Sequence, residues 1–189
     1  TDSTVFPYFT VGTVVHGYNR GSKELGCPTG ISKSRKDIYI IVPFSANFDE
    51  ETVDKLPSGI YQGVYYGWAK LLTTNDNKIY PMVTSVGTNP FYHGEKKTMV
   101  FRLIFYVFFS RFFVLGNTYS TQFVEDFYGE TLSIVLLGEI RKMTTFNNLD
   151  ELIAAIHSDI SIAKSKLDTD KSRQYLTHSF FQKNLEFLV

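Results

Sequence analysis

A glycine-rich, basic loop near the start of the chain is the segment best suited to chemistry. Three glycines, Gly17, Gly21 and Gly26, fall within ten residues directly after a strand-like run. Glycines let a backbone approach a ligand closely, and successive backbone N–H groups can then form a nest for an anion. Arg20 and Lys23 add positive charge, which a triphosphate needs. On glycine and basic content alone, however, a flexible surface loop is the better interpretation.

The loop is not a Walker A motif. That motif requires the pattern G-x-x-x-x-G-K-[ST], whereas here Gly21 directly precedes Ser22 and Lys23. No helix signal follows the loop either. Phosphates bound here must therefore be held by a different arrangement.

The chain ahead of residue 148 reads mainly as strands and turns. Short runs rich in β-branched and aromatic residues are typical of strands. They occupy Phe9–His16, Gly63–Leu72, Ile79–Val86 and Thr131–Ile140. Pro81 cannot donate to a strand ladder and predicts an edge position for its run. Gly138 predicts a bulge or a close contact.

One apolar stretch, Val100–Leu115, has to be weighed as a membrane span. It is sixteen residues long and contains Arg102 and Arg111. A spanning helix needs about 20 predominantly apolar residues. We therefore expect a buried strand or pair of strands, and no membrane partner.

The period of the apolar residues changes in the last quarter of the chain. They recur every three or four residues at Leu152, Ile153, Ile156, Ile160, Ala163 and Leu167. This spacing predicts an amphipathic helix between Asn148 and Leu167, with Asn148 as N-cap and Glu151 completing something close to a capping box. We place Asp159 on its solvated face. In the tail that follows, Phe180, Phe181, Phe187 and Leu188 suggest that it docks back on the body.

Composition narrows the class of protein. The 189 residues include 19 basic and 19 acidic ones, so no strong field favours nucleic acid or anionic lipid. The single cysteine, Cys27, excludes an internal disulfide and suits a reducing compartment. No secretory signal is visible at the start, and we expect a cytoplasmic location. The four histidines show no metal-ligand spacing.

The order of residues around the loop resembles the signature of the eukaryotic-type riboflavin kinases. Gly12–Thr29 reads G-x-V-V-x-G-x-x-R-G-S-K-x-L-G-x-P-T. Further similar segments are Leu56–Ala69, Ser85–Tyr92, Lys96–Met99, Asp126–Glu130 and Phe146–Leu152. Together they cover most of residues 8–167, and we expect one riboflavin kinase-like domain over 1–189 with a C-terminal tail at 168–189.

The resemblance implies a monomeric enzyme that uses MgATP to phosphorylate riboflavin to FMN. The family fold is a six-stranded antiparallel Greek-key β-barrel with a C-terminal helix, in agreement with the mainly β pattern. The residues expected at the nucleotide are Gly17, Gly21, Lys23, Gly26, Thr29 and Tyr128. The family's flavin contacts fall on Arg141 and Phe146.

The family's P-T-A-N motif, whose Thr and Asn hold Mg²⁺, is split in this chain. Thr29 is followed by sixteen extra residues, 30–45, before Ala46 and Asn47. If Asn47 is the second ligand beside Thr29, the insertion must loop out and bring its ends together. The entropic cost of such a loop grows by only roughly 0.6 kcal/mol per doubling of length.

The family's catalytic Glu, the general base on the riboflavin hydroxyl, is replaced by Val100. No Glu occurs in residues 100–124, so we assign no catalytic base. Losing a general base typically costs about 10²–10⁴ in rate. Segments 30–45 and 100–124 both begin abruptly inside motifs, which motivates the hypothesis that they are untranslated or misassigned. Peptide mapping that recovers both from the natural protein would contradict it.

Two other functions stay open at this point. A non-catalytic flavin- and nucleotide-binding degenerate kinase is favoured by the missing Glu and disfavoured by the intact loop Gly17–Thr29. A flavin-dependent reductase barrel fits the fold class but not the loop with Arg20 and Lys23. Trp68 could stack on a flavin, but we expect it in the barrel core.

Overall fold

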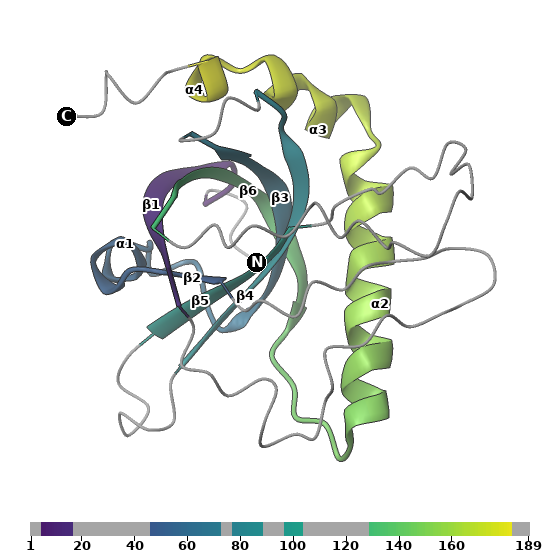
Figure 1. Ribbon diagram of the computed structural model, residues 1–189. Helices are drawn as coiled ribbons and strands as arrows, with labels where there is room; N and C mark the ends of the chain where they lie inside the picture. The colour runs from purple at the N-terminus through teal and green to yellow at the C-terminus, as the bar shows by residue number, and fades with distance from the viewer. Residues whose placement is uncertain (1–4, 17–45, 73–76, 89–96, 104–128, 183–189) are drawn as a thin grey trace, which may run out of the picture.

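The computed structural model describes residues 5–16, 46–72, 77–88, 97–103 and 129–182 (Figure 1). Its strands are β1 Tyr8–His16, β2 Ala46–Phe48, β3 Gly63–Leu71, β4 Tyr80–Thr88, β5 Lys97–Leu103 and β6 Thr131–Lys142. All neighbouring pairs are antiparallel and follow the closed order β1-β2-β5-β4-β3-β6. Helices follow the last strand. A mainly β, antiparallel fold with a helical C-terminal end is thus confirmed.

Four of the strands coincide with the predicted runs, and one prediction about them is wrong. β4 pairs with both β3 and β5, so its run does not lie at an edge. Pro81 pairs with Trp68 of β3, and among the described residues the pairing with β5 begins at Met82. Pro81 is the second residue of β4, near the strand start, where a missing N–H interrupts the ladder least. β5 takes up the start of the apolar stretch, whose remainder, 104–115, lies outside the described residues.

The interior of the barrel is an apolar core. It is built from alternate residues of the strands, among them Val14, Met82, Met99 and Ile134, each fully buried. Tyr65 lies in the same core, and its hydroxyl donates to the backbone oxygen of Tyr61 at 2.7 Å. Burial, together with the negative charge of Glu139, raises the pKa of Tyr65 to about 12. The phenol therefore stays neutral in the core.

Helix α2, Leu149–Leu167, packs on the outside of the barrel rather than at its end (Figure 1). Its Ala163 is fully buried against Val64 of β3 and Val83 of β4. The helix lies where the apolar period places it. Among the helices that the structure describes, none has the length and apolar character that a membrane crossing requires.

The chain beyond α2 folds back over the same outer face, as predicted. Helix α3, Asp170–Arg173, the 3-10 helix η2, Gln174–Thr177, and helix α4, Ser179–Gln182, follow in turn. Phe181 is fully buried together with Trp68 and Val135. Trp68 is therefore buried outside the barrel wall, not inside it, which corrects our expectation. Phe187 and Leu188 lie outside the described residues.

Candidate functional site

Strand register places the predicted metal, base and flavin positions in one row across the barrel wall. The directly paired residues are Asn47, Val100, Ser85, Val64 and Arg141, in that order. Neighbouring strands lie about 4.8 Å apart, so the row extends for roughly 19 Å along the wall. Phe48, next to Asn47, belongs to the interior core. Because successive side chains alternate between faces, Asn47 lies on the outer face, where Val64 packs against α2.

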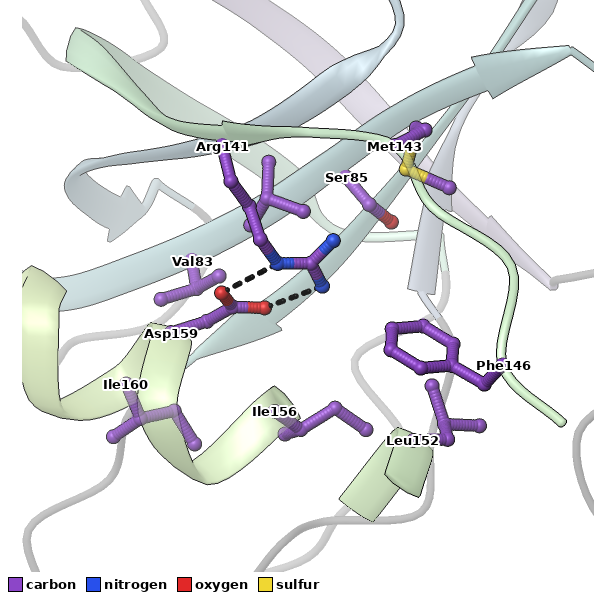
Figure 2. Close-up of a pocket in the computed structure, with 10 residues that line it drawn as sticks. Val83, Ser85, Arg141, Met143, Phe146, Leu152, Ile156, Asp159 and Ile160 are labelled. Atoms are coloured by element: carbon purple, nitrogen blue, oxygen red, sulfur yellow. Dashed lines mark hydrogen bonds and ion pairs between the residues drawn. The ribbon is translucent and has the colours of Figure 1, made fainter. Parts of the chain in front are cut away.

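A pocket lies at the Arg141 end of this row, between the outer face of the sheet and helix α2 (Figure 2). Its walls are mainly apolar and include Val83, Met143 and Ile156. The polar groups facing it come from Ser85, Arg141 and Asp159. Such a lining, apolar with a few convergent polar groups, suits an aromatic ligand that also carries hydrogen-bonding groups.

Arg141 forms a two-bond ion pair with Asp159 in this pocket, as Figure 2 shows. Nε donates to Oδ1 at 2.8 Å, and Nη2 donates to Oδ2 at 2.8 Å. The Asp159 side chain is only 5% exposed, and that of Arg141 is 28% exposed. Asp159 therefore faces the sheet, which contradicts its placement on the solvated face. Residue 159 lies between Ile156 and Ile160 on the apolar side of the helix. This position in the sequence could have predicted that Asp159 faces the sheet.

The two predicted flavin residues do come together. The Arg141 guanidinium carbon lies 5.6 Å from the centre of the Phe146 ring, within the range of a cation–π contact. Phe146 sits on the connection between β6 and α2, directed toward the pocket (Figure 2). The contact gives the arginine an aromatic neighbour in addition to its carboxylate.

The N-terminal cap of α2 fixes that connection. The Asn148 side chain accepts from the backbone N–H of Glu151 at 2.9 Å. In return, Glu151 Oε2 accepts from the backbone N–H of Asn147 at 3.0 Å. The predicted N-cap is confirmed, with the reciprocal bond made one residue earlier than in a standard capping box. The cap thus holds the backbone at Asn147, the residue that directly follows Phe146.

At the other end of the row, Asn47 has a side-chain oxygen that no described residue satisfies. The residue is 7% exposed, and its Oδ1 is buried without a hydrogen-bond partner among the described residues. A buried amide oxygen without a partner is unfavourable, and a ligand that bonded to it would remove that cost. A hard oxygen donor fits Mg²⁺. In the described part of the chain, His, Cys, Asp and Glu form no cluster of three that could hold a metal.

Asp49, which sequence reasoning missed, anchors the short strand that carries Asn47. It caps helix α1, Glu50–Asp54, by accepting from the backbone N–H and the hydroxyl of Thr52, each at 2.9 Å. It also accepts from the backbone N–H of Thr13 at 2.9 Å. Burial alone raises the pKa of Asp49, but these hydrogen bonds outweigh it and lower the pKa below 3.8. In the sequence, the three-residue spacing from Asp49 to Thr52 was the local sign of this helix cap.

Val100 lies on β5 between Asn47 and Ser85 in the backbone register. A valine side chain has no atom that can accept a proton. The remaining predicted nucleotide residues, namely Gly17, Gly21, Lys23, Gly26, Thr29 and Tyr128, lie outside the described residues.

The fold is that of known riboflavin kinases. A crystal structure of riboflavin kinase from Trypanosoma brucei superposes with a TM-score of 0.62 at 24% identity, covering 94% of this chain and 87% of that one. The riboflavin kinases of human and mouse are each 36% identical over 176 residues, which is 93% of this chain and 91% of theirs. The bifunctional riboflavin kinase/FMN phosphatase of Arabidopsis thaliana is 35% identical over 162 residues, or 34% of its length.

The family model for flavokinase, described as riboflavin kinase, matches residues 4–167. The chain belongs to the riboflavin kinase family. The resemblance deduced from the motifs is thereby confirmed.

Proposed function

We propose that this chain transfers the γ-phosphoryl group of ATP to the ribityl 5′-hydroxyl of riboflavin, giving FMN and ADP. The observation that carries the proposal is the row on the outer barrel face, with Asn47 at one end and Arg141 at the other. Riboflavin is elongated, with its ring at one end and the reacting hydroxyl at the other. An extended substrate along this row has its ring in the pocket and its hydroxyl toward Asn47.

The flavin ring would bind in the pocket beside α2. Phe146 offers an aromatic surface, and the Arg141 guanidinium offers N–H donors to the carbonyl oxygens of the ring. Ser85 contributes a hydroxyl on the same wall. These groups bind and orient the acceptor, which accounts for much of the catalysis in phosphoryl transfer.

The nucleotide would bind at the Asn47 end. By the family resemblance, the phosphates would receive backbone N–H groups and a positive charge from Gly17, Gly21, Lys23 and Gly26. Asn47 and Thr29 would hold Mg²⁺, which when bound neutralises charge on the phosphate oxygens. Tyr128 would lie on the nucleotide side. The buried Oδ1 of Asn47, which has no hydrogen-bond partner in the described part of the chain, supports this assignment.

The finer features of the resemblance belong to the same proposal. We infer a six-stranded Greek-key barrel, one domain over residues 1–189 with inserted segments at 30–45 and 100–124, and a monomer acting in the cytoplasm. The closed pairing order of the described strands supports the barrel. The inserted segments lie almost wholly outside the described residues, and peptide mapping decides whether the natural protein contains them.

The assay that tests the function measures FMN after incubation of the protein with riboflavin, ATP and Mg²⁺. We expect FMN above a no-enzyme control, abolished by EDTA because the phosphates lose their counter-charge. No FMN, with tight flavin binding retained, would favour the degenerate, non-catalytic kinase, which the Val100 substitution keeps in consideration.

A gain-of-function variant sharpens that test. Val100→Glu places a carboxylate at the position where the family has its base, and we expect the rate of FMN formation to rise by about 10²-fold or more. Val100→Gln is the matched control, since it has nearly the same shape and cannot accept the proton. Equal rates for the two variants would show that this slot does not serve as the base position.

A further inference from the structure

We propose that Asp159 is a positioning residue for flavin binding, acting through Arg141. The inference rests on the proposed function and adds to it a residue on α2, an element separate from the strand that carries Arg141. Asp159 does not need to touch the substrate. Its role is to fix the orientation of the guanidinium in the pocket and to offset its positive charge.

The hydrogen bonds of Arg141 define which donors remain for a ligand. A guanidinium has five N–H groups. Asp159 takes one on Nε and one on Nη2, and the backbone oxygen of Lys142 takes one on Nη1 at 3.2 Å. Among the described residues, this leaves one N–H on each terminal nitrogen. Two neighbouring donors on one planar group match the carbonyl and ring-nitrogen acceptors along one edge of an isoalloxazine.

The ion pair also sets the charge of the pocket. Asp159 is nearly fully buried, and its carboxylate offsets the positive charge of Arg141 beside an apolar wall. A neutral pair suits an uncharged flavin ring. Without the carboxylate, the guanidinium would be free to turn toward solvent, because the Arg141 side chain is already 28% exposed. It would then leave the face of Phe146.

Such an arrangement lowers the ordering cost of binding. An arginine side chain has many rotamers, and a bidentate carboxylate holds the planar group in one of them before the ligand arrives. Loss of Asp159 should therefore weaken riboflavin binding without affecting ATP, which binds at the far end of the row.

The experiment compares Asp159→Asn, Asp159→Glu, Arg141→Gln and the double variant Arg141→Gln/Asp159→Asn. Riboflavin Kd is measured by quenching of flavin fluorescence, and KM is measured separately for riboflavin and ATP. We expect Asp159→Asn to raise Kd and KM for riboflavin by ~10-fold, the loss of one charge-assisted interaction. KM for ATP should stay unchanged, and Asp159→Glu should recover part of the loss. Asp150→Asn, the same change at an exposed position of α2, is the matched control.

The double variant separates positioning from a merely structural role. If Asp159 acts through Arg141, adding Asp159→Asn to Arg141→Gln weakens riboflavin binding no further. Additive losses, a parallel rise in KM for ATP, or wild-type riboflavin binding in Asp159→Asn would each overturn the proposal. Should Asp159→Asn not fold, Asp159→Glu must still weaken riboflavin selectively.

The design distinguishes this proposal from the proposed function. Riboflavin binding is measured without turnover. If the wild type makes no FMN and Asp159→Asn binds riboflavin more weakly than the wild type, the positioning role is supported and the kinase activity is contradicted. If the wild type makes FMN and Asp159→Asn binds riboflavin as tightly as the wild type, the kinase activity is supported and the positioning role is contradicted.

Discussion

At the scale of single residues, the two ends of the candidate site differ in how completely their polar side chains are hydrogen-bonded by the described residues. Arg141 has its carboxylate, its aromatic neighbour and a backbone acceptor in place. Asn47 is buried with its side-chain oxygen unbonded among the described residues. The end of the row at Arg141, where we propose that the flavin binds, is thus preorganised. The end at Asn47, where we propose the metal, has an oxygen that no described residue satisfies.

Asn47 should consequently show a trade-off between stability and function. Replacing it with Leu, of similar volume, removes a buried oxygen that no described residue bonds and whose desolvation costs about 1–3 kcal/mol. We expect the free energy of unfolding of Asn47→Leu to equal or exceed that of the wild type, while KM for MgATP rises about 10-fold or more. Urea unfolding and steady-state kinetics measure the two quantities. A destabilised variant with unchanged kinetics would show that Asn47 is a structural residue only.

At the scale of elements, the site depends on a few short connections that hold strands in register. Strand β2 has only three residues, and Asp49 links it to β1 and starts α1. On the other side of the row, β3 and β6 are joined through register shifts between Val64 and Tyr65 and between Tyr66 and Gly67. These irregularities place Arg141 and Val64 opposite each other.

Asp49→Ala tests the anchor of β2 and predicts a pH dependence. The folded-state pKa of Asp49 lies below its ordinary 3.8, so its charged form stabilises the fold above that pH and loses this effect as the pH falls through the folded value. We expect Asp49→Ala to lower the unfolding free energy by about 1 kcal/mol at pH 7, and by less near pH 3.

Asp54→Ala, at the exposed end of the same helix, is its control and should stay within about 0.5 kcal/mol of the wild type. The result that contradicts the anchor is an Asp49→Ala deficit of constant size from pH 3 to pH 7 in urea titrations.

Gly67 holds the second of the two register shifts. A Cβ at this position would lie 1.9 Å from the backbone oxygen of Val135, so the two strands could not approach as they do. We expect Gly67→Ala to cost about 3 kcal/mol or more, because the backbone itself must move. Thermal unfolding followed by circular dichroism measures the loss.

The matched control for Gly67 is Gly87→Ala on β4. There, among the described residues, the nearest atom to a new Cβ is the methyl of Met143 at 3.9 Å, an ordinary contact. A stability loss of equal size in both variants would rule out the clash as the cause. The predicted close contact at Gly138 is confirmed in the same region, since its Cβ would lie 2.9 Å from a ring carbon of Tyr66.

At the scale of the whole molecule, the segment beyond the family match forms part of the fold. The match ends at residue 167, yet the chain up to Gln182 covers the outer wall of the barrel (Figure 1). The buried Lys70 donates through Nζ to the backbone oxygen of Phe181 at 2.7 Å. Trp68 donates through Nε1 to the backbone oxygen of Ser172 at 3.0 Å. Both bonds join β3 to the C-terminal segment.

The single tryptophan makes this docking measurable. Phe181 is fully buried beside Trp68, so Phe181→Ala should cost about 3–5 kcal/mol and shift the tryptophan emission to the red. Ile162→Ala removes a 38% exposed side chain from α2 and should leave both the stability and the emission unchanged. An unshifted emission in Phe181→Ala would mean that the segment is not docked in solution.

The sequence by itself determined the features that depend on near neighbours in the chain. Strand runs, the helix from Asn148 to Leu167 with its cap, and the motif segments are all encoded in short windows, because side-chain period and capping chemistry act locally. The family followed from the same windows, and so did the expectation that Arg141 and Phe146 belong to one site.

Only the tertiary structure decided which distant groups meet. The row from Asn47 to Arg141 arises from strand pairing, and the Asp159 carboxylate reaches Arg141 across eighteen positions of sequence. A carboxylate on a helix is expected in solvent unless a partner offsets the cost of burying its charge, and no local pattern names that partner. The sequence therefore identified the family and the candidate residues. The packing of α2 on the barrel decided that Arg141 is held by Asp159.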